Sequence, residues 1–174
     1  DTVKFIAIDE EPLAEYGPMN SWIREESARL ADMLFVHDGN APAVLAFDIM
    51  FVGNQDEDVD SHLVRALSGR PVVTGSNLVY RGTTVYNQGI YYFDSFNISS
   101  EARPYEELDA GARSGFTNTL ISMDGFIRST QLAATVDGNT RYSFAEEIYR
   151  LYCEETGKPH EVPEADKAVT FGYS

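Results

Sequence analysis

The chain has 174 residues, with 28 Asp and Glu against 13 Lys and Arg, and a formal charge of −15 at pH 7. This length suits a single domain over residues 1–174 that buries its own hydrophobic core. The acidic balance excludes a nucleic-acid binder that relies on a basic face, and it disfavours docking on anionic lipid headgroups. Cations, neutral small molecules and proteins remain as partners.

The sequence has no apolar run of about 18 residues, the length that a transmembrane helix requires. It begins at Asp1 without an initiator Met or a signal-peptide pattern, so we expect it to be a piece of a larger protein. Cys153 is the single cysteine and cannot form an internal disulfide.

The first half of the chain alternates apolar runs with helical patterns. The runs at residues 3–8, 43–49 and 71–79 predict buried strands. Apolar stripes at residues 22–34 and 63–67 predict helices between them. This alternation is typical of βαβ units, so we expect the three strands to be neighbours in one parallel sheet.

The rhythm changes after a predicted turn at residues 81–82. Residues 83–93 are rich in Tyr, Val and Thr, which favours antiparallel or edge strands. Tyr91, Tyr92, Phe93 and Phe96 would place rings on both faces of such a strand. The rings on one face of the strand must then be covered by a ligand, a partner or another part of the chain. We favour cover by another part of the chain.

Strand-like residues 116–121 and 127–136 flank Asp124 and Gly125, a pair typical of hairpin turns. We expect Gly125 to take a positive φ there and Arg128 to pair with a carboxylate.

Two further signals shape the end of the chain. Asp137 and Gly138 form a second hairpin turn signal. Ser143 and Glu146 form a capping box at the start of a helix that ends near Gly157. The sequence therefore predicts the α/β class, with a parallel βαβ first half continuing into an antiparallel second half, as one mixed sheet flanked by helices.

Most enzyme signatures are absent from the sequence. It contains no glycine-rich phosphate loop, no dinucleotide-binding glycine pattern and no Gly-x-Ser-x-Gly elbow. His37, His62 and His160 are scattered without metal-ligand spacing.

Acidic side chains are the candidates for a binding site. Asp9 and Asp48 each end a predicted strand, and Asp60 closes an acidic segment at residues 54–60. Because ligands gather at the carboxyl ends of parallel strands, these carboxylates could hold a divalent cation such as Mg²⁺ or Ca²⁺. The sequence suggests no other cofactor. The alternative, which we favour, is that Asp9 and Asp48 bond backbone amides beside a solvated loop.

Several short motifs recur in an order that spans nearly the whole chain. They are Ile8-Asp9, Gly17-Pro18, Trp22, Arg24, Phe47-Asp48-Ile49-Met50-Phe51, Asp60, Leu63, Ala66-Leu67, Gly115-Phe116, Asn118, Asp124-Gly125, Arg128 and Ser143-Phe144-Ala145. Together they resemble the second type of CHASE domain, an extracellular sensory domain associated with cyclases and histidine kinases. Among them, Gly115, Asp124, Gly125, Arg128 and Ser143 are expected to be structural.

The resemblance implies a non-catalytic sensor on the outer face of a bacterial plasma membrane. Membrane helices would flank it, and a cyclase, histidine kinase or serine/threonine kinase would follow in the cytoplasm. The signal would be an unknown small molecule or protein, both ends of the domain would lie on one side, and a homodimer would fit such partners. Two alternatives stay open, a metal-dependent hydrolase that uses Asp9 and Asp48 and a free-standing periplasmic binding module.

Overall fold

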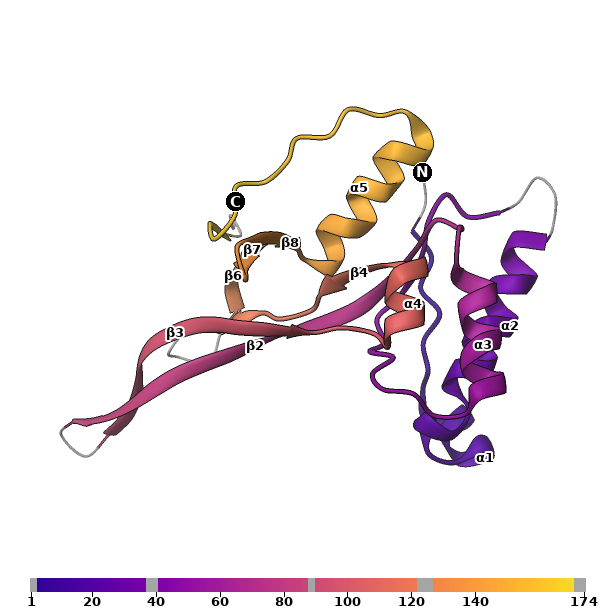
Figure 1. The fold of residues 1–174 in the computed structure, drawn as a ribbon, viewed down its shortest axis with the longest axis horizontal. Helices are drawn as coiled ribbons and strands as arrows, with labels where there is room; N and C mark the ends of the chain where they lie inside the picture. Colours follow the sequence, from indigo (N-terminus) through magenta and orange to yellow (C-terminus); the bar gives the residue numbers. More distant parts are fainter. Residues whose placement is uncertain (1–2, 37–40, 88–89, 122–126, 171–174) are drawn as a thin grey trace.

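The computed structural model describes residues 3–36, 41–87, 90–121 and 127–170 (Figure 1). The helices are α1 (Glu10–Tyr16), α2 (Ile23–Val36), α3 (Glu57–Leu67), α4 (Glu106–Gly111) and α5 (Phe144–Thr156), with a 3-10 turn, η1, at Met19–Ser21. The strands are β1 (Leu45–Phe47), β2 (Val72–Asn87), β3 (Ile90–Ala102), β4 (Arg113–Phe116), β5 (Leu120–Ile121), β6 (Ile127–Gln131), β7 (Ala133–Val136), β8 (Asn139–Tyr142) and β9 (Ala168–Thr170).

Strand β2 organises the main sheet. Its first residues pair in parallel with β1 on one edge and with β4 on the other. Beyond Ser76 it pairs with β3 in an antiparallel ladder, and the two strands extend as an arm away from the helices (Figure 1). The predicted mixed α/β class, with parallel and antiparallel strands flanked by helices, is confirmed.

The prediction of a first strand at residues 3–8 is wrong. This segment forms no strand, and the Phe5 side chain is 93% exposed. A strand needs a neighbouring backbone to pair with, and residues 3–8 pair with none, while β1 and β4 are the two parallel neighbours of β2. The parallel sheet therefore runs β1-β2-β4 and not through residues 3–8.

The predicted turn at residues 81–82 is also wrong, because β2 continues to Asn87. The ladder with β3 runs through Arg81 and Gly82, and its register shifts at Val79/Tyr80 and Thr83/Thr84, on either side of them. The side chains of residues 91–96 lie outside the described part of the chain, so the cover of the aromatic rings stays a prediction.

Local capping signals explain where α3 begins. The segment at residues 54–60, predicted as a loop, instead enters this helix. Asp56 accepts hydrogen bonds from the backbone N–H groups of Asp58 and Val59, both at 3.1 Å. The helix therefore starts at Glu57 and places Asp60 inside its first turns.

The second half follows its turn signals closely. Strands β7 and β8 meet at Asp137 and Gly138, which have φ values of 49° and 76° as a tight hairpin turn requires. Strands β5 and β6 pair antiparallel as predicted, and β9 adds to β6 as a last edge strand. The predicted turn at Asp124 and Gly125 lies outside the described residues, as do the two ends of the chain.

Two apolar clusters hold these layers together. The larger packs α2 and α3 against β1 and the start of β2, around fully buried residues such as Phe51 and Leu63. The smaller joins Leu78 of β2 and Phe116 of β4 to the inner face of β7. The C-terminal layer of β7, β8 and α5 thus packs on β2 and β4, apart from α2 and α3 (Figure 1).

Candidate functional site

The start of α5 meets β4 at a very close backbone contact. A Cβ atom on Gly115 would lie 2.7 Å from the Cα atom of Phe144 and 2.8 Å from the carbonyl oxygen of Ser143. The Ser143 hydroxyl accepts a hydrogen bond from the backbone N–H of Glu146 at 3.2 Å, which caps α5 as predicted. We call this contact, between Gly115 and residues 143–144, the seam.

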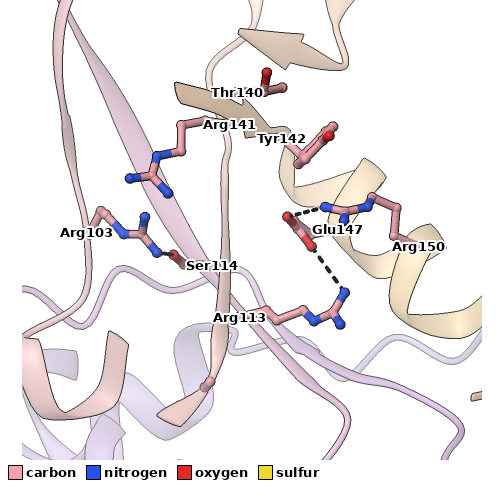
Figure 2. A pocket seen from close by; sticks show the side chains of 9 residues that line it. Arg103, Arg113, Ser114, Thr140, Arg141, Tyr142, Glu147 and Arg150 are labelled. Carbon is pink, nitrogen blue, oxygen red and sulfur yellow. Dashed lines mark hydrogen bonds and ion pairs between the residues drawn. The ribbon is translucent and has the colours of Figure 1, made fainter. Parts of the chain in front are cut away.

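A pocket of about 320 Å³ opens beside the seam (Figure 2). Its charged wall consists of Arg103, Arg113, Arg141, Arg150 and Glu147, and its remaining lining is Ala112, Ser114, Thr140 and Tyr142. We call it the arginine pocket. It collects four of the ten arginines of a strongly acidic chain.

The four arginines come from both sides of the seam. Arg103 directly follows β3 and Arg113 opens β4, so both belong to the main sheet. Arg141 lies on β8 and Arg150 on α5, so both belong to the C-terminal layer. The pocket is therefore built only when the two layers are docked.

Glu147 holds one half of the pocket together. Its Oε1 accepts a hydrogen bond from Arg150 at 2.9 Å, and its Oε2 lies 3.7 Å from Nη1 of Arg113 (Figure 2). Burial raises the pKa of the Glu147 carboxyl, and the nearby Arg150 and Arg113 oppose this rise. Arg113 also donates two hydrogen bonds to Glu154, at 3.1 and 2.5 Å.

In the other half of the pocket, fewer polar side-chain atoms have a hydrogen-bond partner. Arg103 donates to Asp109 at 2.9 Å and to the Ser114 hydroxyl at 3.1 Å. Arg141 has its Nε 3.3 Å from Oε2 of Glu101, yet both atoms are buried without a hydrogen bond. Among the described residues, the Arg141 side chain makes no hydrogen bond, and it is 38% exposed.

Asp60 lies in a different, buried network. Its carboxylate pairs with the guanidinium of Arg24 and accepts the backbone N–H of Gln55 at 2.8 Å. Arg24 is 3% exposed and also donates to the carbonyl oxygens of Val52 and Gly53, at 3.0 and 2.6 Å. This network ties the loop after β1 to α2 and α3.

Tyr105 completes this network. Its ring centroid lies 4.8 Å from the guanidinium carbon of Arg24, and its hydroxyl donates to the carbonyl oxygen of Asp60 at 2.9 Å. Burial, with the charge of Asp60, raises the pKa of Tyr105 to about 12. The satisfied partners give Asp60 a structural role in this arrangement.

The remaining predicted site residues lie apart from the arginine pocket. Asp9 is exposed and caps α1 by accepting the backbone N–H of Glu11 at 3.2 Å. Asp48 is exposed directly after β1. Since residues 3–8 form no strand, the sheet edge that was to join these two acids does not exist. Arg128 lies on β6, and its expected partner Asp124 is outside the described residues.

Within the described residues, no three His, Cys, Asp or Glu side chains are grouped to hold a metal ion. No described helix combines the length and the apolarity that crossing a membrane demands.

The comparison with family models shows the family of the chain. The model of the CHASE2 domain matches residues 1–172. The chain belongs to the CHASE2 domain family. CHASE2 domains are extracellular, non-catalytic sensory modules. Neither the curated proteins nor the solved structures contained a match to this CHASE2 domain.

Proposed function

We propose that this CHASE2 domain is the ligand-binding sensor of a membrane-bound bacterial receptor, and that it controls a cytoplasmic cyclase or kinase. The observation that carries the proposal is the arginine pocket, whose walls come from both sides of the seam. A ligand in such a pocket contacts the main sheet and the C-terminal layer at once, so its binding energy depends on how the two layers are docked.

The proposed mechanism is a change in the docking of α5 and β8 on β4. A ligand shifts an equilibrium only by its difference in affinity for the two arrangements. Arg103 and Arg113 on one layer, and Arg141 and Arg150 on the other, provide that difference, because they reach one ligand together only when the layers are closed. Flanking membrane helices and a homodimer would carry the change to the output domain.

The test uses the parent receptor in bacterial membranes, with cyclic-nucleotide production or autophosphorylation as the output. Gly115→Ala would force Phe144 and Ser143 away from β4, because the added Cβ lies under 3.0 Å from their backbone. Overpacking of this kind costs about 1–3 kcal/mol and is relieved by moving α5. We expect the basal output to change at least severalfold.

Gly75→Ala is the matched control. Gly75 is the register partner of Gly115 on β2, and its added Cβ would lie 3.2 Å from the carbonyl oxygen of Ile49, away from the seam. We expect its output to stay near that of the unmodified receptor at equal folded protein. Equal outputs from both variants and the unmodified receptor would contradict the sensor role and favour a free-standing binding module.

A further inference from the structure

We infer that the arginine pocket binds a small oxyanion, a carboxylate or a phosphate group, between Arg103 and Arg141. This inference rests on the proposed sensor function, because it names the chemical class of the ligand that the sensor takes. It goes beyond the family assignment, which carries no ligand.

The charge of the pocket wall is the first argument. Four guanidinium groups and one carboxylate line the pocket. The other acids that pair with these arginines, Glu101, Asp109 and Glu154, are not part of its lining, and the Glu101 side chain is only 4% exposed. A ligand that enters therefore meets a basic surface, although the chain as a whole carries a charge of −15.

The second argument is the position of Arg103 and Arg141. Nη1 of Arg103 and Nε of Arg141 lie 3.7 and 3.3 Å from the same buried oxygen of Glu101. Asp109 also pairs with Arg103, at 2.8 Å from its Nη2, whereas Glu101 is the one acid beside Arg141 among the described residues. Figure 2 shows the ends of the Arg103 and Arg141 side chains next to each other among the residues that line the pocket, so one oxyanion there would contact both.

The third argument is the supply of hydrogen-bond donors. Arg141 uses none of its five N–H groups in a hydrogen bond among the described residues, and Arg103 uses two groups, toward Asp109 and Ser114. A carboxylate or a phosphate accepts two parallel N–H groups from one guanidinium. The Thr140 hydroxyl in the lining can donate one neutral hydrogen bond, whereas the Ser114 hydroxyl already donates to Asp109 at 3.2 Å.

Glu147 tunes this site. Its carboxylate is the one negative charge in the lining, and it already engages Arg150 and faces Arg113. Glu147 therefore keeps Arg150 and Arg113 engaged in their own ion pairs, and its charge repels an anion that enters the pocket. Replacing it by Gln would remove that repulsion and keep the size of the side chain.

The experiment titrates the 174-residue protein by calorimetry at constant ionic strength in chloride. The probes are succinate, inorganic phosphate and succinamide, the neutral analogue of succinate. We expect binding of succinate, phosphate or both and none of succinamide; the stronger of the two anions identifies the acid group. Arg141→Gln should weaken binding about 10- to 100-fold, because a hydrogen bond to a charged group is lost.

The control variant is Arg65→Gln, an exposed arginine on α3, which should bind like the unmodified protein. Glu147→Gln should bind the anion several-fold more tightly, an outcome that a misfolded variant cannot produce. No binding of either anion, or equal affinities for the unmodified, Arg141→Gln and Glu147→Gln proteins, would overturn the inference. That result would leave the response of the receptor to Gly115→Ala, and hence the sensor role, unaffected.

Discussion

The pair of Arg24 and Asp60 allows the strongest stability prediction. Arg24→Met keeps most of the side-chain length and removes the charge. It would leave the Asp60 carboxylate buried with the single N–H of Gln55, and the carbonyl groups of Val52 and Gly53 without their donor. Removing one partner of a buried ion pair costs about 3–5 kcal/mol. A domain of this size has a free energy of unfolding of about 5–15 kcal/mol, so the variant would be close to marginal.

Urea unfolding followed by the fluorescence of Trp22, the single tryptophan, measures this loss directly. Trp22 lies two residues before Arg24, and its indole N–H donates to the carbonyl oxygen of Gly17 at 3.1 Å. The double variant Arg24→Met with Asp60→Leu should be less destabilised than the sum of the two single variants, because no buried charge is left unpaired.

Arg65→Met on the exposed side of α3 serves as the control and should change the free energy of unfolding by less than about 0.5 kcal/mol. A loss below about 1 kcal/mol for Arg24→Met, or strict additivity in the double variant, would refute the reasoning.

Two further predictions concern helix packing and capping. The hydrogen bond to Glu25, with a second contact to Asp32, raises the pKa of His62 from its ordinary value of 6.5. The stabilisation from protonated His62 is thus fully present below pH 6.5 and is lost as the pH rises through the raised pKa. The midpoint of urea unfolding should fall over that pH range, and His62→Gln should remove this pH dependence. Ser143→Ala should lower the free energy of unfolding by about 1 kcal/mol through loss of the α5 cap, and Ser143→Thr should restore most of it; equal stability of Ser143→Ala and the unmodified protein would contradict the cap.

Local signals predicted the second half of the fold well. The Asp137-Gly138 turn and the Ser143 cap each act within a few residues, so the sequence alone places β7, β8 and α5. The close approach of Gly115 to Phe144, in contrast, joins residues 29 positions apart, and no local signal indicates it.

Pairing between distant segments was harder to predict. The run at residues 3–8 is apolar like β1, but whether such a run forms a strand depends on pairing with a distant segment, which a local pattern does not contain. Asp60 was considered as a ligand for a cation, while its partner Arg24 lies on another helix, 36 residues earlier.

The arginine pocket could not be predicted from the sequence. Three of its arginines lie on β4, β8 and α5 and the fourth, Arg103, directly follows β3, without a motif or a fixed spacing. Net charge describes the average surface, and it gave no indication that four arginines gather at one place in so acidic a chain.

The most direct test of the central claim is the output of the parent receptor in membranes, titrated with the oxyanion that binds the isolated domain. We predict a saturable change in output for the unmodified receptor and for Arg65→Gln. Arg141→Gln should shift the midpoint of that change to about 10- to 100-fold higher concentration. The account would be contradicted if the output did not change at anion concentrations that saturate the domain. It would also be contradicted if the Arg141→Gln receptor responded with an unchanged midpoint.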